Sequence, residues 1–211
     1  VVVRNHCDAN GTHGIWLGHG TGATVKDNDC KGNQRSGIDV SETARPGVLN
    51  NRCVGNRRDG IQVRTEAQPR LENNTCRDNR GHGIRYADTA GGTATKCKCT
   101  ANDQHGILVG GQAAPALEDN QCEGNGGAGI CLAEHAAGGA ARNRCVGDRD
   151  GILVQDEARS AVEANLCENN TRDGIAVAAQ ARPARLRGNL AGKNGRHDVH
   201  DQRPLHVRLM G

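Results

Sequence analysis

The chain has 211 residues, a hydrophobic content of 35% and a formal net charge of +3. This near-neutral balance provides no broad positive field for nucleic acid or for an anionic membrane surface. The sequence also contains no run of apolar residues long enough to cross a bilayer. We therefore expect no nucleic-acid partner and no membrane partner, while enzymes and binding proteins both remain open.

The chain begins inside a repeating unit. Val1-Val2-Val3 leads directly into Asn5 and Cys7, without an initiator Met, a signal-peptide pattern or a polar capping segment. Repeat proteins normally end in capping units, and targeting segments normally precede the folded part. We therefore interpret residues 1–211 as a single domain taken from a longer protein.

The first unit sets a pattern that returns every 23 residues. It contains an Asn-x-Cys segment, a turn asparagine, a Gly-Ile-x-Val-like segment and one further apolar position. The cysteine column consists of Cys7, Cys30, Cys53, Cys76, Cys99, Cys122, Cys145 and Cys167. The glycine column runs from Gly14 to Gly174 with the same spacing. Both columns shorten by one residue near Asp148-Arg149-Asp150, so we place a deletion there.

Each unit predicts three short strands separated by turns. In chain order, we expect strands at the cysteine, at the Gly-Ile segment and at the last apolar position, which is Val25 in the first unit. Alternation with period two directs the Ile and Val side chains inward, and Gly, Asn, Asp and Pro mark the turns. Stacking of such units predicts an all-β, single-stranded right-handed parallel β-helix solenoid of about nine coils. Its interior would hold ladders of Cys, Ile, Val and Asn.

Residues 59–63 and 67–76 resemble the repeats of a known group. The segments Asp-Gly-Ile-Gln-Val and Ala-Gln-Pro-Arg-Leu-Glu-Asn-Asn-Thr-Cys are similar to those of the pectate-lyase-like right-handed parallel β-helices. Within that superfamily they resemble the short uniform repeats of F-box substrate receptors, of copper-site maturation proteins of nitrous oxide reductase, and of bacterial β-helix repeat proteins. The resemblance covers essentially the whole chain and implies the fold. It implies no single function, because the superfamily includes lyases, epimerases, hydrolases and non-catalytic modules.

The ten cysteines are better explained as core residues than as bridges or metal ligands. Stacked strands hold neighbouring side chains ~4.8 Å apart, beyond the ~3.8 Å between Cβ atoms that is usual in a disulfide. A straight ladder of thiols also does not converge on one ion. Reduced thiols favour a cytoplasmic location. Cys97 takes an asparagine position, and Cys131 is expected to face solvent, either as a reactive thiol or as an incidental surface residue.

Candidate catalytic residues lie around the start of the Gly-Ile strands. Asp59, His82 and His105 occupy one column in neighbouring coils, and Arg64 and Arg85 project from the adjacent strand or its end. A carboxylate, two imidazoles and guanidinium groups can bind an acidic sugar or transfer a proton. Asp and His are also ordinary residues of turns before glycine. Both the catalytic and the structural interpretation therefore stay open.

Neither a metal nor a cofactor is expected. The stacked His82 and His105 lack the third protein ligand that is typical of a catalytic zinc site, although they offer two ligands to an adventitious ion. Asp150 and Asp173 form a second acidic pair. Two carboxylates supply too few oxygens for the six to eight that calcium requires.

A cluster of arginines provides a candidate partner-binding surface. Arg35, Arg57, Arg58 and Arg80 lie in the turn before the Gly-Ile strand in consecutive coils. Guanidinium groups in this arrangement can dock an acidic protein or polysaccharide. The alternative is a solvated charged surface that keeps the rod soluble.

We expect a non-catalytic β-helical repeat module that recognises or scaffolds a protein or a glycan. Uniform coils provide no loops to wall a polymer groove, and the aromatic residues offer only Trp16 outward, since Tyr86 is expected inward. The alternative is a polysaccharide-active enzyme, a lyase or epimerase acting on acidic sugars. A structural spacer and end-to-end self-association through bare strand edges also remain open.

Overall fold

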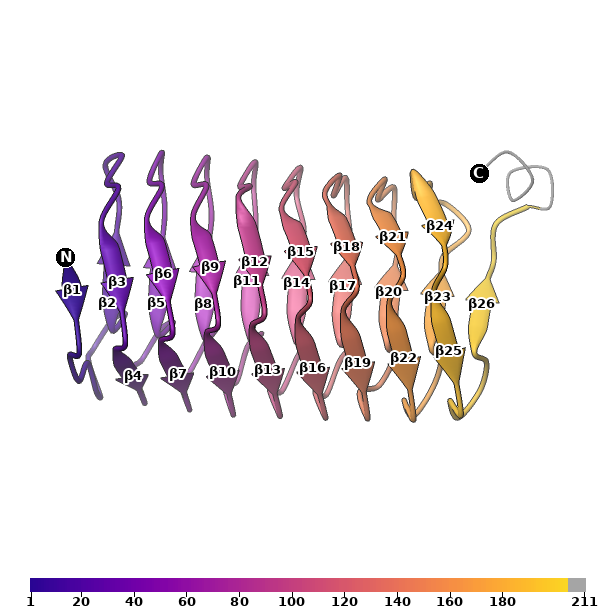
Figure 1. Cartoon of the computed structure of the whole chain (residues 1–211), viewed down its shortest axis with the longest axis horizontal. Coiled ribbons are helices and arrows are strands. Elements are labelled where there is room, and N and C mark those ends of the chain that lie inside the picture. Colours follow the sequence, from indigo (N-terminus) through magenta and orange to yellow (C-terminus); the bar gives the residue numbers. More distant parts are fainter. Residues whose placement is uncertain (205–211) are drawn as a thin grey trace.

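The computed structural model describes residues 1–204, which form an elongated rod of stacked coils with β1 and β26 at opposite ends (Figure 1). Within these residues the backbone forms 26 strands and no helix. The strands belong to three sheets that run along the rod, and the strand pairs are parallel. The predicted all-β parallel solenoid is confirmed. No helix in the described part of the chain has the length and apolar character needed to span a membrane.

Sheet A carries the last apolar position of each repeat. Its nine strands are β1 (Val2–Val3), β3 (Thr24–Lys26), β6 (Gly47–Leu49), β9 (Arg70–Glu72), β12 (Thr93–Thr95), β15 (Ala116–Glu118), β18 (Gly139–Ala141), β21 (Ala161–Glu163) and β24 (Arg185–Arg187). The middle residues of β3 to β21 are buried, from Val25 to Val162. Charged residues at the strand ends lie on the outside.

Sheet B carries the cysteine column. Its eight strands are β4 (Asp29–Lys31), β7 (Arg52–Val54), β10 (Thr75–Arg77), β13 (Lys98–Thr100), β16 (Gln121–Glu123), β19 (Arg144–Val146), β22 (Leu166–Glu168) and β25 (Leu190–Gly192). Each central cysteine from Cys30 to Cys167 is buried, and all ten cysteines of the chain are free thiols. The expectation that this ladder forms part of the core is confirmed.

Sheet C carries the Gly-Ile segments. Its nine strands are β2 (Ile15–Leu17), β5 (Ile38–Val40), β8 (Ile61–Val63), β11 (Ile84–Tyr86), β14 (Ile107–Val109), β17 (Ile130–Leu132), β20 (Ile152–Val154), β23 (Ile175–Val177) and β26 (Val199–Asp201). The first and third residues of most strands point inward, and Tyr86 is fully buried as expected. The glycine before each isoleucine is required by packing. A Cβ on Gly60 would lie 2.6 Å from the Gly83 carbonyl oxygen.

The pairing register locates two changes in coil length. Cys122 pairs with Cys145, but the next strand pair already joins Ile130 to Ile152. This step from 23 to 22 residues confirms the deletion predicted near Asp148-Arg149-Asp150. A compensating insertion follows between residues 177 and 185, since partners further along are 24 residues apart. Both changes lie in turns, so the side-chain columns stay aligned.

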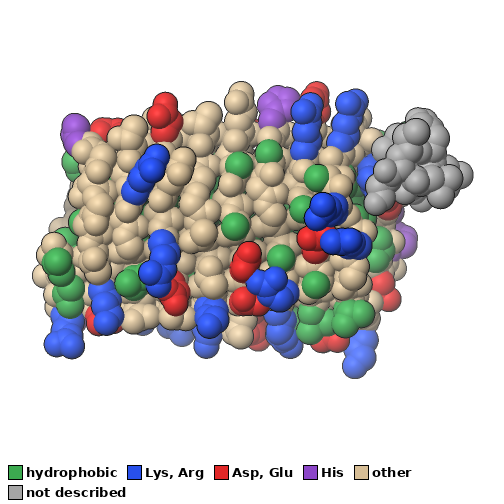
Figure 2. Space-filling model, turned by 45° about the horizontal axis from the view of Figure 1, so that its top comes forward, with side chains coloured by type: hydrophobic (Ala, Val, Ile, Leu, Met, Phe, Trp, Pro, Cys, Tyr) green, Lys and Arg blue, Asp and Glu red, His purple; other side chains and the backbone are tan. Residues whose placement is uncertain are grey.

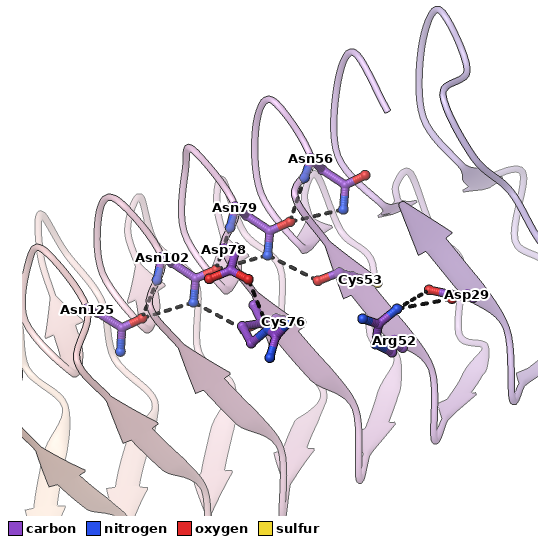
Figure 3. Close-up of polar contacts among 10 residues, drawn as sticks. Asp29, Arg52, Cys53, Asn56, Cys76, Asp78, Asn79, Asn102 and Asn125 are labelled. Atoms are coloured by element: carbon purple, nitrogen blue, oxygen red, sulfur yellow. Dashed lines mark hydrogen bonds and ion pairs between the residues drawn. The ribbon is translucent and has the colours of Figure 1, made fainter. Parts of the chain in front are cut away.

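Two ladders of asparagine amides close the corners on either side of sheet B. Figure 3 shows the ladder that follows the cysteine strands. Asn79 Oδ1 accepts hydrogen bonds from the backbone N and from Nδ2 of Asn56, each at 3.0 Å. Asn79 Nδ2 in turn donates to Asn102 Oδ1 at 2.9 Å and to the Cys53 carbonyl at 3.2 Å. Each buried amide thus satisfies polar groups of the coils on both sides.

Each ladder contains one residue that is not asparagine. Cys97 accepts a weak contact from Asn74 Nδ2 at 3.9 Å, in place of an amide oxygen. Asp148 accepts from the backbone N and from Nδ2 of Asn125, both at 2.8 Å. Its second oxygen, Oδ2, is buried and has no hydrogen-bond donor among residues 1–204. Burial raises the pKa of Asp148 to about 7 despite the two hydrogen bonds from Asn125.

Cys131 is not at the solvent surface, and the prediction of an exposed reactive thiol was wrong. Its side chain points away from the core of the solenoid, but its exposed fraction is only 1%. Leu108 and Leu153 pair with it on either side in sheet C. Together with Ala128 and Ala133 they form a small second apolar cluster on the outer face. Burial and nearby carboxylates raise the pKa of the Cys131 thiol to about 12, so the thiolate is suppressed.

Candidate functional site

The outer face of sheet C carries the candidate residues. The middle residue of each strand points away from the core, and parallel pairing aligns these residues in one column along the rod. The column consists of Trp16, Asp39, Gln62, Arg85, Leu108, Cys131, Leu153, Ala176 and His200. The residues that precede the glycines form a second column beside it.

The second column is a chain of side-chain acceptors. The backbone N of His82 donates to Asp59 Oδ1 at 2.8 Å, and the backbone N of His105 donates to His82 Nδ1 at 3.2 Å. The backbone N of Ala128 donates to His105 Nδ1 at 2.8 Å. An Nδ1 atom that accepts a hydrogen bond carries no proton, so both imidazoles are held as the neutral tautomer protonated at Nε2. These side chains support the turn of the next coil.

The two histidines stack as predicted. Their ring centroids lie 5.3 Å apart and the rings are nearly parallel, at 4°. Burial, followed by the neighbouring imidazole and Arg85, lowers the pKa of His82 to about 3. Burial also lowers the pKa of His105. Both rings are therefore neutral at physiological pH.

Asp59 and Arg85 lie beside the stacked rings. Asp59 is 4% exposed, and burial raises its pKa, although the hydrogen bond from His82 and the charges of Arg85 and Arg58 act in the opposite direction. The Nε atom of Arg85 is buried and has no hydrogen-bond partner among the described residues. The structure therefore brings together four of the five candidate residues: Asp59, His82, His105 and Arg85.

Arg64, the fifth candidate, is bound to a carboxylate that the sequence did not single out. Its Nε and Nη2 atoms each donate to one oxygen of Asp39 at 3.1 Å. Asp39 is fully buried, at 0% exposed. This fork-shaped pair neutralises the carboxylate and fixes the guanidinium group. The only sequence signal for Asp39 was its outward position in the Gly-Ile-x-Val segment.

The position of Arg35 and Arg58 in the predicted arginine cluster recurs along the rod, and arginine returns there in the last three coils. Backbone hydrogen bonds join successive coils in the turn between sheets B and C, and they align Arg58 with Arg35 and Arg172 with Arg149. The aligned residues are Arg35, Arg58, Gly81, Gln104, Gly127, Arg149, Arg172 and Arg196. We call this set the arginine column. It places guanidinium groups at both ends of the rod along one edge of the sheet C face.

Arg57 and Arg80 lie next to the arginine column in neighbouring coils, where the structure also places Arg35 and Arg58. All four side chains are exposed. None of them forms an ion pair or a side-chain hydrogen bond with another residue between 1 and 204. Binding of a partner by these four guanidinium groups stays a prediction.

A depression of about 430 Å³ lies at the C-terminal end of the sheet C face. Its lining includes the small residues Ala128 and Ala176, at positions where most other coils carry larger side chains. Its polar lining comes from His105, Arg149, Asp150, Gln155, Arg172, Asp173, His200 and Gln202. Arg149 and Arg172 share the Asp150 carboxylate at 4.0 and 3.8 Å, which leaves one positive charge unbalanced in this group.

A cluster of Asp173, His197 and His200 lies at the same end. Asp173 Oδ1 contacts His197 Nδ1 at 2.8 Å, and Asp173 Oδ2 contacts His200 Nδ1 at 3.3 Å. Burial alone would raise the pKa of Asp173, but the two imidazoles outweigh it and lower the pKa. The repeat pattern in the sequence places His197 in the same column as Asp173, but it does not indicate that His200 lies beside them. Such an association requires the exact coil lengths around the insertion.

The surface offers no aromatic platform beyond Trp16, which is 49% exposed as expected. Trp16 Nε1 donates to Ser41 Oγ at 3.1 Å, so this ring is fixed at the N-terminal end of the face. Figure 2 shows one side of the rod, where Lys and Arg side chains lie among Asp and Glu and hydrophobic side chains form only small separate patches. Polar contacts therefore dominate what this side can offer to a ligand.

The family model described as a right handed beta helix region matches residues 1–145 and 87–202. The chain belongs to this family of right-handed β-helix proteins. A search of curated proteins gives no match. Similar solved structures include the periplasmic alginate epimerase AlgG, with 15% sequence identity and a TM-score of 0.71, and its T265N mutant, with a TM-score of 0.74.

These alignments cover 89% of this chain and 47% of the epimerase chain. The chain thus spans less than half the length of the solved structures that it matches. At this level of identity the likeness establishes the shared β-helix fold. The side chains of this chain must carry any argument about function.

Proposed function

We propose that this chain is a non-catalytic recognition module that binds an acidic polysaccharide along the sheet C face. The observation that carries the proposal is the arginine column, which borders a polar depression on an otherwise regular surface. A polymer of uronate residues would lie parallel to the rod, with its carboxylates toward the guanidinium groups. The epimerase with a similar fold is named for alginate, an acidic polysaccharide, which agrees with this choice of ligand.

The charges in the arginine column suit an extended anionic ligand. Guanidinium groups bind carboxylates through two parallel hydrogen bonds, and neither Arg35 nor Arg58 forms an ion pair with a carboxylate among residues 1–204. Each exposed ion pair contributes only about 0.2–1 kcal/mol. Several pairs along one polymer would together approach the ~4 kcal/mol of a millimolar complex. We therefore expect weak binding that weakens further as salt is added.

The test compares binding of oligouronates with binding of a neutral glucan of equal length. The Arg35→Gln and Arg58→Gln double variant should lose about 2- to 30-fold in affinity for the oligouronate, because two exposed ion pairs with the ligand are removed. Arg144→Gln is the matched control, since Arg144 is exposed on sheet B. Equal affinity for the charged and neutral sugars, or equal losses in the double variant and the control, would overturn the proposal.

A polysaccharide-active enzyme is the second candidate, and one observation favours it. Asp59, Arg85 and two neutral imidazoles lie together on the face that also carries the depression. The Asp59 carboxylate can accept a proton, the Nε2–H group of a neutral imidazole can donate to a sugar oxygen, and a guanidinium group can neutralise a uronate carboxylate. Such an enzyme would be a lyase or epimerase. Incubation with polyuronates, with detection of unsaturated product or of changed uronate composition, tests this candidate, and turnover that disappears in His82→Gln and His105→Gln would support it.

Acidic proteins are the other class of partner that these exposed arginines can bind.

The rod also exposes apolar residues at its ends, including Val1 at 93% and Leu190 at 69%. Strand edges with such residues favour pairing with another copy. Sedimentation at several concentrations would detect end-to-end association of this chain, and a constant mass would exclude it.

A further inference from the structure

We propose that Asp173, His197 and His200 form a binding site for a divalent transition-metal ion such as Zn²⁺. The site lies at the C-terminal end of the sheet C face. Its three ligands are not part of the arginine column, although Asp173 and His200 line the same depression. The proposal reverses the expectation from sequence that the chain has no metal site, which considered only His82, His105 and the acidic pair.

Two different parts of the fold supply the ligands. Asp173 precedes β23, and pairing of Ile175 with Val199 places His197 at the same position in the next coil. His200 is the middle residue of β26, so its side chain lies on the outer face beside Ala176. The regular pairing of β23 with β26 therefore fixes all three side chains relative to one another. Asp173 and His197 lie in the turns just before these strands, and only His200 lies on a strand itself.

The distances between the ligand atoms fit a tetrahedral ion. Ligands that lie ~2.0–2.1 Å from a tetrahedral Zn²⁺ are separated from each other by about 3.3 Å. The Asp173 oxygens lie 2.8 Å from His197 Nδ1 and 3.3 Å from His200 Nδ1. One ligand atom from each residue lies within 4.8 Å of the other two. Small rotations of the two imidazoles would complete the geometry.

Burial and access also fit a metal site. The Asp173 side chain is 2% exposed, whereas those of His197 and His200 are 55% and 37% exposed. A buried carboxylate below two accessible imidazoles leaves a path for an ion to enter from solvent. Asp173 and His200 also line the depression, so the fourth ligand position would face it. Three protein ligands and one open position are typical of catalytic or substrate-binding zinc sites.

The ligand types favour a transition metal over calcium or magnesium. Two imidazole nitrogens and one carboxylate suit Zn²⁺, Co²⁺, Ni²⁺ or Cu²⁺. Calcium requires six to eight oxygen ligands, which this cluster does not supply. To bind the metal, both Nδ1 atoms must give up the protons through which they contact Asp173 at present. Bonds from the metal to the two imidazoles and to the Asp173 carboxylate then replace the two hydrogen bonds that the imidazoles form with this carboxylate.

The experiment measures binding of the metal alone to the full chain under reducing conditions. Titration calorimetry with Zn²⁺ should give one equivalent for the natural sequence. His197→Gln and His200→Gln should each weaken binding by more than about tenfold, at least the loss seen when a supporting residue of a metal site is removed. His135→Gln is the matched control, because His135 is an exposed imidazole that contacts a single carboxylate, Glu157, at 3.7 Å. It should bind Zn²⁺ as the natural sequence does.

Substitution with Co²⁺ identifies the ligands. Intense visible bands without a sulfur-to-cobalt charge-transfer band would support a tetrahedral site of nitrogen and oxygen ligands. A charge-transfer band would assign the metal to thiols and overturn the proposal. Binding that is unchanged in His200→Gln, or absent in the natural sequence, would also overturn it. Since His200 is partly exposed, its substitution should leave the fold intact, which the thermal unfolding curve of the variant verifies.

Discussion

At the scale of single residues, Asp148 differs chemically from the asparagines of its ladder. Its Oδ2 occupies the position at which an asparagine would place its amide nitrogen, 2.5 Å from a Cβ built on Gly129. Elsewhere in the ladder this nitrogen donates to a carbonyl of the cysteine strand and to the next amide oxygen. A carboxylate cannot donate, so the position favours a protonated Asp148. The raised pKa of Asp148, about 7, agrees with this requirement.

The free energy of unfolding should therefore depend on pH through Asp148. Its folded pKa of about 7 exceeds the ordinary value of 3.8, so the native state binds more protons between these values. Stability from this group is complete below about pH 4 and is lost as the pH rises to about 7. Asp148→Asn removes this loss. Its stabilising effect should be larger at pH 8 than at pH 4 by up to about 4 kcal/mol, which urea unfolding at the two pH values measures.

Asp103→Asn is the control for that experiment, because Asp103 is exposed in the corresponding turn two coils earlier. Its effect on unfolding should be small and nearly independent of pH. A pH dependence that is the same in Asp148→Asn and in the natural protein would show that Asp148 does not carry the proton.

At the scale of elements, the corner after each strand of sheet B requires a left-handed backbone. Gly32, Gly55, Gly124 and Gly147 adopt φ values from +62° to +68° there. Ala101 occupies the same corner with φ +51°. A residue with a Cβ pays about 1–2 kcal/mol in this conformation, whereas glycine does not. The corner in the coil of Ala101 is therefore strained.

Ala101→Gly should raise the free energy of unfolding by up to about 1 kcal/mol, because relief of the left-handed strain exceeds the added flexibility of the unfolded chain. Chemical denaturation of the variant measures the change. Ala114→Gly provides the control, since Ala114 is also exposed but has no positive φ. It should destabilise the protein slightly, and a similar loss in Ala101→Gly would contradict the strain argument.

The columns of the fold were predictable from sequence because each depends only on spacing. Cys53, Ile61 and Asn56 recur at fixed positions, and parallel stacking turns that recurrence into contact. The burial of Cys131 was not predictable in this way, since it depends on the size of Leu108 and Leu153 in the neighbouring coils. The ion pair between Asp39 and Arg64 joins two neighbouring coils diagonally. Its two residues are 25 positions apart in the sequence, so the 23-residue repeat does not indicate the contact. Side-chain direction, rather than spacing, decides such contacts.

At the scale of the whole molecule, each coil contacts mainly the coils next to it, so the rod should accept an additional unit. We expect a variant with a second copy of residues 55–77 inserted after Arg77 to fold. The insertion begins and ends at an exposed corner, and it adds one step of ~4.8 Å to each sheet. The slope of the free energy of unfolding against urea concentration should become steeper by about one ninth, in proportion to the added buried surface. Small-angle scattering should show a longer rod.

The control inserts 12 residues of the same segment, about half of a coil. This insertion places polar turn residues in the Cys, Ile and Val columns, so it should prevent cooperative folding. Failure of the full-coil variant to fold would show that the coils are not interchangeable units.

The regular spacing of the coils also fixes the distances between the arginines of the arginine column. Arg58 and Arg149 are separated by Gly81, Gln104 and Gly127, so four steps of ~4.8 Å, or about 19 Å, lie between the two groups of charges. Backbone pairing sets that interval between the backbone positions of the two groups. A stiff linear anion that engages both groups must carry charges in phase with this interval. The protein would then select among anionic chains by their repeat length, because only a chain with a matching repeat places its charges at both groups of arginines.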